Sequence, residues 1–390
     1  MSTGTVYDDV VAVARGISPM SRFTFSLATE LDDAQLRACM AKNWMDGDIA
    51  ISFRREPSYF AGCSLQGNQV QVVICRDVES QQIVGLGSRC RSMMHINGKP
   101  VNAGYLADLR IDPAYRHGLL LAQGYRYLRS LHNAYPLPAY FTIIFNGNKP
   151  ALQSLVGGRA GLPTYYPMGQ ILTPAIHLDF VKSTIALPGI QLRRAKQSDL
   201  KLMVKFMNEC FVLRQFSPVY CEQDFLSGGR CAGLLVEDFF LALKDGCIIG
   251  TLAAWDQSNV RQTHIERYSS ALAALRPIYN LASAISSLKS LPTIGSRIPY
   301  LNICCIAIEH DDIETFRALL RFAYNELRSG PWHYAIASLH ELDPLVSVLD
   351  EYRSISAAGL LYRVEFDKND TSKDSITLDN RIPYFEMALA

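Results

Sequence analysis

The amino-acid sequence repeats one order of predicted elements in its two halves, and this repeat restricts the fold more than any other feature. Each half is predicted to run strand, helix, strand hairpin, strand, helix, strand, helix, strand, from the spacing of its apolar residues. Hairpins combined with strand–helix–strand units predict an α/β (α+β) protein with mixed sheets. We therefore predict two tandem domains. The repeat lies in the pattern and not in residue identity, and we prefer duplication to coincidence.

The two predicted domains meet next to STIALPGIQ, a small segment containing Pro and Gly that is typical of a linker. The N-terminal domain spans residues 1–184 and closes with the strand ILTPAIHLDF, and the C-terminal domain spans residues 185–390 and closes with GLLYRVEF. The second half also carries an extra segment, about residues 259–297, which we predict to be a mostly helical insertion.

The charge balance and the scattered cysteines and histidines exclude several classes of function. The 390 residues include 38 Lys and Arg against 37 Asp and Glu, so no overall field attracts nucleic acid or an anionic membrane. We find no secretory signal and no apolar run long enough for a membrane helix. Neither the ten cysteines nor the eight histidines show a metal-ligand spacing. We therefore expect a cytoplasmic protein with reduced thiols and no metal site.

The segment DLRIDPAYRHGLLLAQGYRYL, residues 108–128, takes a strand through a tight basic turn directly into a helix. The first N–H groups of such a helix have no intrahelical partners, and together with the helix dipole they favour an anion. Arg116 and Gly118 would let a diphosphate approach the backbone and would add a charged contact. The alternative is that Arg116 is a solvated surface residue and Gly118 only eases the turn.

This segment resembles the acyl-coenzyme A loop of the GNAT superfamily of N-acetyltransferases, written Arg/Gln-x-x-Gly-x-Gly/Ala after an apolar strand. The lead-in Leu109–Arg116 is similar to that family's approach, but Gly118 comes one residue early and Leu120 replaces the second small residue. Asn148–Ala151 is similar to the family's Asn-x-x-Ala after the fifth strand. The resemblance implies acetyl-CoA or another acyl-CoA as co-substrate. The residues that it implies for binding are Leu109, Ile111, Arg116, His117, Gly118 and Leu119, with Asn146 and Asn148 on the pantetheine amides or, alternatively, as helix caps.

Transfer of an acyl group to an amine needs a group that takes or directs the amine proton, and an acid for the leaving thiolate. By strand alternation Asp108 shares a face with Leu106 and Arg110, and we predict that it is the base or the residue that orients the amine. The alternative is an ion pair with Arg110 or a neighbouring strand. The family's usual Tyr is missing, because Leu155 and Val156 stand in its place.

Tyr165 and Tyr166 are the nearest replacements for that acid, or they pack the sheet edge. In the second half, WDQSNVRQT places Trp255, Asp256 and Arg261 at a strand end. With Arg110, they are our predicted substrate-binding residues, although an inter-domain contact explains them equally well. The junction IAIEHDDIETF carries Glu309, Asp311 and Asp312 where a diphosphate would lie, so we predict that this half does not bind coenzyme A.

These features predict an N-acyltransferase that moves an acetyl or other acyl group from acyl-CoA to a small-molecule or peptide amine. One alternative is an acyl-CoA-binding or sensing protein without turnover, favoured by the shortened loop and the missing Tyr. Another is a transferase whose donor is an acyl carrier protein, which a patch of basic residues would attract. The four residues of that patch would be Arg110, Arg116, Arg126 and Arg129. The acceptor and the oligomeric state do not follow from the sequence.

Overall fold

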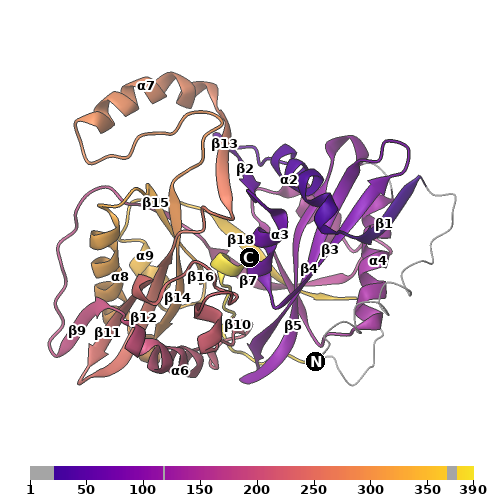
Figure 1. The fold of residues 1–390 in the computed structure, drawn as a ribbon. Helices are drawn as coiled ribbons and strands as arrows, with labels where there is room; N and C mark the ends of the chain where they lie inside the picture. Colours follow the sequence, from indigo (N-terminus) through magenta and orange to yellow (C-terminus); the bar gives the residue numbers. More distant parts are fainter. Residues whose placement is uncertain (1–21, 117–118, 367–375) are drawn as a thin grey trace.

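Two large mixed sheets lie side by side in the computed structural model, which describes residues 22–116, 119–366 and 376–390 (Figure 1). The first sheet contains, in spatial order, β1 (Phe23–Leu27), β3 (Gln69–Asp77), β4 (Ile83–Ile96), β5 (Lys99–Ile111), β6 (Tyr140–Phe145), β18 (Ala358–Glu365), β7 (Thr164–Leu172) and β16 (Leu339–His340), with β10 (Ser217–Pro218) paired to β4. The second contains β17 (Ser354–Ile355), β8 (Ala175–His177), β15 (Tyr334–Ala337), β14 (Tyr300–Ile308), β12 (Cys247–Trp255), β11 (Phe239–Lys244) and β9 (Ile190–Arg194). The predicted class, α/β with two tandem domains, is confirmed.

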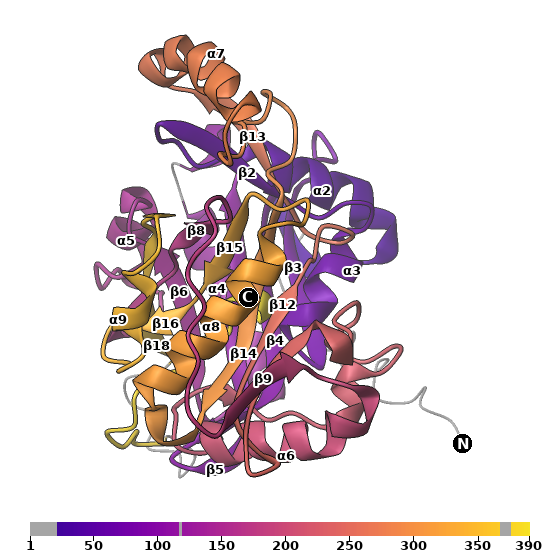
Figure 2. The same ribbon diagram turned by 90° about the vertical axis from the view of Figure 1, so that its left-hand side faces the viewer.

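Each sheet is covered by helices on both faces. In the first half α4 (Leu120–Ala134) buries Tyr125, Leu128 and Leu131 against one face, while α2 (Asp33–Lys42) and α3 (Tyr59–Cys63) cover the other. In the second half α6 (Leu200–Phe211) and α8 (Ile313–Leu327) lie on opposite faces, and α8 covers the outer one (Figure 2). The remaining helices are α5 (Lys149–Leu155), α7 (Ser270–Ala284) and α9 (Val346–Leu349). Burial of these apolar helix faces produces one core on each side of each sheet.

The two halves exchange their closing strands. We predicted that ILTPAIHLDF closes the first sheet and GLLYRVEF the second, but β8 pairs with β15 in the second sheet and β18 lies between β6 and β7 in the first. ILTPAIHLDF crosses between the sheets at Thr173 and Pro174, which separate β7 from β8. Apolar alternation indicates a strand but does not select the sheet that receives it. The exchange connects the two halves by backbone hydrogen bonds.

The segment predicted as a helical insertion is a helix only in part. Its first portion is β13 (Gln262–Tyr268), which pairs antiparallel with β2 (Ile49–Arg54) of the first half as a separate two-stranded sheet. Helix α7 follows and projects from the rest of the protein (Figure 1). The alternating pattern of QTHIERY indicates a strand. We predicted a mostly helical segment because the neighbouring residues form an apolar helix.

The C-terminal segment, residues 376–390, runs between the two sheets (Figure 1). Phe385 belongs to the core of the first half, whereas Tyr384, Ala388 and Leu389 belong to a core of the second. The 3-10 turn Met387–Leu389 ends the segment. Within the described part of the chain, no helix has the length and apolar character needed to cross a membrane.

Candidate active site

Strands β5 and β6 lie parallel but separate after a short contact. In these two strands, all of whose residues the structure describes, only Gly104 pairs with Tyr140 and Tyr105 with Phe141. A Cβ on Gly104 would lie 2.2 Å from the Tyr140 ring, so glycine permits the close approach there. Just beyond, the Thr142 hydroxyl donates a 2.7 Å hydrogen bond to the Leu106 carbonyl in place of a backbone partner. The edge of β5 that follows is therefore open toward β6.

A β-bulge in β5 directs Asp108 to the face of the sheet that lies opposite α4. The register between β4 and β5 shifts between Leu86 and Ser88, and Asp108 has a φ of 55°. Because β5 has one extra residue at this point, the alternation of its side chains between the two faces of the sheet is interrupted. Ala107 and Asp108 therefore lie on the same face. Our prediction that Asp108 faces with Leu106 is wrong, because strand alternation fails at a bulge. Leu106 and Leu109 belong instead to the α4 core.

Asp108 lies in a nearly closed charged cluster. Its Oδ2 is 2.5 Å from Nη2 of Arg55 and accepts a 3.2 Å hydrogen bond from the Tyr59 hydroxyl. Burial raises the pKa of Asp108, but the charges of Arg55 and Arg110 outweigh it and the pKa is lowered overall. The ion-pair partner of Asp108 is Arg55, which follows β2, and not Arg110 or a residue of a neighbouring strand as the alternative interpretation had it. An ionised carboxylate held in this way is a weak base, so the cluster favours an orienting role over proton abstraction.

On the α4 face, an apolar cavity of about 40 Å³ lies between α4 and strands β1, β3, β4 and β5. The cofactor candidates Leu109 and Ile111 line it, together with Leu120, Leu121 and Tyr125 of α4. Tyr125 and Tyr165 share a hydrogen bond between their hydroxyls. Burial raises the pKa of Tyr165 well above its ordinary value, which weakens it as an acid.

The helix-entry segment is described up to Arg116 and again from Leu119, and His117 and Gly118 lie outside the described residues. Asp112 caps the turn at Pro113 by accepting a 3.0 Å hydrogen bond from the Ala114 N–H. Arg116 donates from Nε to the Ile111 carbonyl and from Nη2 to Asn43, which holds its guanidinium near the strand end. Leu119 occupies the N-cap position of α4 and has no side-chain acceptor, so its side chain leaves the first N–H groups of the helix uncapped.

The other cofactor and acid candidates are more dispersed. Asn148 caps α5 by accepting a 3.2 Å hydrogen bond from the Ala151 N–H, as its alternative interpretation predicted. Asn146 donates to the Gln170 side chain at the protein surface. Tyr166 lies on the opposite face of β7 from Tyr165, with Arg363 4.9 Å from its ring centre. Because β6 and β18 separate β7 from β5, neither phenol borders the open edge beside Asp108.

The second half repeats this geometry but closes it with its own side chains. Strands β14 and β15 separate after Ile303 and Ala337, and a bulge at Cys305, with a φ of 52°, matches the one at Asp108. Here the Cys305 N–H donates a 2.8 Å hydrogen bond to Oε2 of Glu386 in the C-terminal segment. Asp312 caps α8 through the Thr315 N–H at 2.8 Å. A carboxylate thus occupies each position where an anionic ligand would bind.

The three second-half candidates have different surroundings. Trp255 is 2% exposed in the core, so it is structural rather than exposed to a substrate. Asp256 is exposed and accepts a 2.8 Å hydrogen bond from the Trp332 indole N–H. Arg261 crosses to the first half, where its Nε donates to the Gly62 carbonyl at 2.9 Å. Of the three, only Arg261 adjoins the Asp108 cluster, because its charge contributes to the pKa of Asp108.

Three residues of the site were not identified from the sequence. Arg55 and Thr142 stand in ordinary strand and loop patterns, and nothing local connects them with Asp108. Glu386 did leave a signal, since it is the lone charge in the apolar segment IPYFEMALA. A single carboxylate in such a run indicates a buried and partnered group.

Comparison with solved structures identifies this architecture. A GCN5-related N-acetyltransferase from Sphaerobacter thermophilus has a TM-score of 0.54 at 12% identity, over 93% of this chain and 99% of its own. The N-myristoyltransferase of Saccharomyces cerevisiae, solved with bound myristoyl-CoA, has a TM-score of 0.59 at 10% identity, over 90% and 80%. The chain has the GNAT fold. No protein-family model and no curated protein sequence matches it.

A GCN5-related glucosamine N-acetyltransferase region of a fungal multi-domain GH3 β-N-acetylglucosaminidase is also similar, with a TM-score of 0.57 at 11% identity over 89% of this chain and 38% of that one. The full-length match to the Sphaerobacter protein agrees with a GNAT fold built from two tandem units.

Proposed function

We propose that the protein is an acyl-CoA-dependent N-acyltransferase whose site lies in the first half. The observation that supports this most strongly is the open edge of β5 between the bulge at Asp108 and the uncapped N-terminus of α4. Beyond Tyr105 the described part of β5 pairs no further with β6, which leaves room for an extended pantetheine along this edge, and the helix N-terminus favours a diphosphate. Similar solved proteins are acyltransferases, which supports the same conclusion.

In this proposal the backbone of Leu109 and Ile111 binds the pantetheine arm. The diphosphate would lie beside Arg116 and Leu119 at the entry to α4, with His117 and Gly118, which lie outside the described residues, as further candidates. Asn146, which follows β6, would contact the pantetheine amides. The residues present fit such a group, since an apolar cavity adjoins the strand and a basic side chain lies at the turn.

The reaction forms a C–N bond and breaks the thioester C–S bond. A neutral amine attacks the acyl carbon, an N–H of the bulge stabilises the oxyanion, and the thiolate leaves with the proton that the amine loses. We propose that Asp108 accepts a hydrogen bond from the amine and orients it. Tyr165 stays the candidate acid: the hydrogen-bonded hydroxyls of Tyr125 and Tyr165 would give a proton to the thiolate and regain the one that the amine loses. Tyr166, which lies on the other face of β7, has no contact that supports the catalytic role we predicted.

The second half is proposed to shape the site without binding acyl-CoA, because Glu386 and Asp312 occupy its bulge and its helix N-terminus. An acyl carrier protein as donor has less support. Arg129 donates a 2.5 Å hydrogen bond to the Phe366 carbonyl, and Arg110 contributes its charge near Asp108, so the four arginines do not present one patch. A cytoplasmic location remains our prediction.

Thiol release tests the proposal. Purified protein is incubated with acetyl-CoA or longer acyl-CoAs and a panel of amines, and free coenzyme A is measured with a thiol reagent. We expect release that requires both protein and amine, and Arg116→Ala should raise the KM for acyl-CoA about tenfold through loss of a charged contact. Arg126→Ala, at an exposed position of α4, is the control and should leave KM unchanged. Stabilisation of the protein by acyl-CoA without amine-dependent release would favour the sensing alternative and contradict transfer.

A further inference from the structure

Positive charge exceeds negative charge around Asp108. Arg55, Arg110 and Arg261 all act on this single carboxylate, and Arg261 reaches it from the other half of the chain. Arg55 is 5% exposed. The pKa of Arg261 is lowered to about 10, mainly by burial and then by the positive charge of the nearby Arg55. Buried charges are costly unless they are compensated. The cluster therefore has uncompensated positive charge.

Arg55 and Arg261 each also have a donor without a partner. Nη1 of Arg55 and Nη2 of Arg261 are enclosed and make no hydrogen bond within the described residues. Their other nitrogens are used, Nη2 of Arg55 by Asp108 and Nη1 of Arg261 by the Ala388 carbonyl at 3.1 Å. Gly62 lies between the two side chains. A Cβ on Gly62 would be 3.0 Å from Cδ of Arg55, and the Gly62 carbonyl accepts a hydrogen bond from Arg261. Enclosed charged donors of this kind are expected to have an acceptor.

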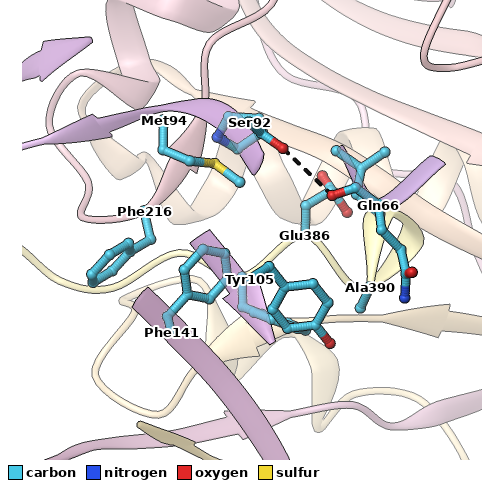
Figure 3. Close-up of a pocket in the computed structure, with 11 residues that line it drawn as sticks. Gln66, Ser92, Met94, Tyr105, Phe141, Phe216, Glu386 and Ala390 are labelled. Carbon is cyan, nitrogen blue, oxygen red and sulfur yellow. Dashed lines mark hydrogen bonds between the residues drawn. The ribbon is translucent and has the colours of Figure 1, made fainter. Parts of the chain in front are cut away.

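A small cavity lies next to this cluster. It is lined by Gln66 and Tyr105 from the first half and by Leu389 and Ala390, which directly follow the Ala388 contact of Arg261 (Figure 3). The side-chain nitrogen of Gln66, which is 3% exposed, is a third enclosed donor without a partner.

One acidic residue, Glu386, also borders the cavity (Figure 3). Its Oε2 is occupied, since it accepts from the Cys305 N–H and from the Tyr384 hydroxyl at 2.7 Å. The carboxylate of Glu386 is thus bound to the second half. It does not supply the acceptor that the donors of Arg55, Arg261 and Gln66 lack.

We propose that Arg55, Arg261 and Gln66 bind the carboxylate of the acyl acceptor, so that the acceptor class is amines that carry a carboxylate, such as free α-amino acids. This inference rests on the proposed transferase function. A carboxylate held by the arginines places an adjacent amine beside Asp108 at the bulge, where the acyl carbon would lie. Gln66 lines the cavity and the two arginines lie beside it, so the carboxylate would lie between the cavity and the arginines. Arginine binds carboxylates through two parallel hydrogen bonds.

Matched acceptors provide the test. Free α-amino acids, their α-carboxamides and aminoalkyl phosphonates are compared by thiol release with acetyl-CoA. We expect a kcat/KM at least about tenfold higher for the acids than for the amides, which is the usual worth of a charged hydrogen bond. The amides have the more readily deprotonated amine, so intrinsic reactivity favours the opposite order. Amides used as well as acids would overturn the proposal, and phosphonates preferred to acids would overturn the choice of carboxylate.

Variants of Arg261 locate the preference. Arg261→Gln should lower kcat/KM for the acids about tenfold, mainly through KM, and leave the amides unchanged, whereas Arg261→Lys should retain most of the preference. Arg267→Gln is the control, because Arg267 lies in β13 just after Arg261 but pairs at the surface with Asp46. An unchanged acid preference in Arg261→Gln would contradict the assignment.

A binding arm separates this inference from the proposed function. N-acetyl amino acids and their amides are added without coenzyme A, and the melting temperature is measured. Stabilisation by the acids in the wild type but not in Arg261→Gln supports the carboxylate site even if no amine releases thiol, in which case only transfer fails. Equal shifts for acids and amides, or no shift with either, would contradict the site.

Discussion

Arg55→Met is expected to lower the free energy of unfolding by about 3–5 kcal/mol, because it leaves a nearly buried carboxylate without its partner. Asp108 is 11% exposed by its side chain, and Arg55 at 2.5 Å is its direct ion-pair partner. Burial alone raises the pKa of Asp108, and loss of Arg55 removes the largest charge that opposes it. Urea denaturation followed by circular dichroism measures the change.

A neighbouring arginine and a second-site change provide the controls. Arg54→Met removes a more exposed pair with Glu266 and should cost at most about 1 kcal/mol. Adding Asp108→Asn to Arg55→Met should recover part of the loss, since asparagine tolerates the positive φ of this position and carries no charge. A loss below about 1 kcal/mol in Arg55→Met, or no recovery in the double variant, would show that the pair does not stabilise the bulge.

The stability of the protein should also depend on the ionisation of Glu386. Burial raises its pKa from 4.5 to about 7, against the opposing hydrogen bonds from Cys305 and Tyr384. The folded protein therefore binds this proton more tightly than the unfolded chain does. Its contribution is complete below the unfolded pKa of 4.5 and is lost as the pH rises through about 7. We expect the contribution of Glu386 to the free energy of unfolding to fall by about 2 kcal/mol from about pH 5.5 to about pH 8.

Comparing variants isolates this effect from other titrating groups. The wild type minus Glu386→Gln difference in unfolding free energy should shift by about 2 kcal/mol over that interval, and the same difference for Glu237→Gln, an exposed carboxylate, should stay flat. A flat difference for Glu386→Gln would mean that the carboxylate is as well solvated in the folded protein as in the unfolded chain.

Local turn chemistry made much of the fold predictable. Asp245-Gly246 is a typical hairpin turn sequence, and both residues have positive φ between β11 and β12. The hairpin of β3 and β4 and the helix from Leu120 also follow the apolar pattern closely. The closing strands could not be placed, since their partners lie about half the chain away and any apolar edge satisfies their alternation.

The site was predictable where it depends on neighbours in sequence. Asn148 and Asp112 cap local turns in the way that their positions indicate. The direction of Asp108 was not predictable, because a bulge depends on the register with β4. The pairing of Asp108 with Arg55 and the contact of Glu386 with Cys305 bring together residues far apart in the chain, and no local pattern reports them.

Hydrogen exchange with and without acetyl-CoA tests the central claim most directly, because it locates the ligand as well as detecting it. We expect slower exchange in peptides that cover residues 106–111 of β5 and 119–124 at the start of α4, with no change at 304–308 and 313–317 of the second half. Protection of the second-half peptides alone, or none anywhere at saturating acetyl-CoA, would contradict it.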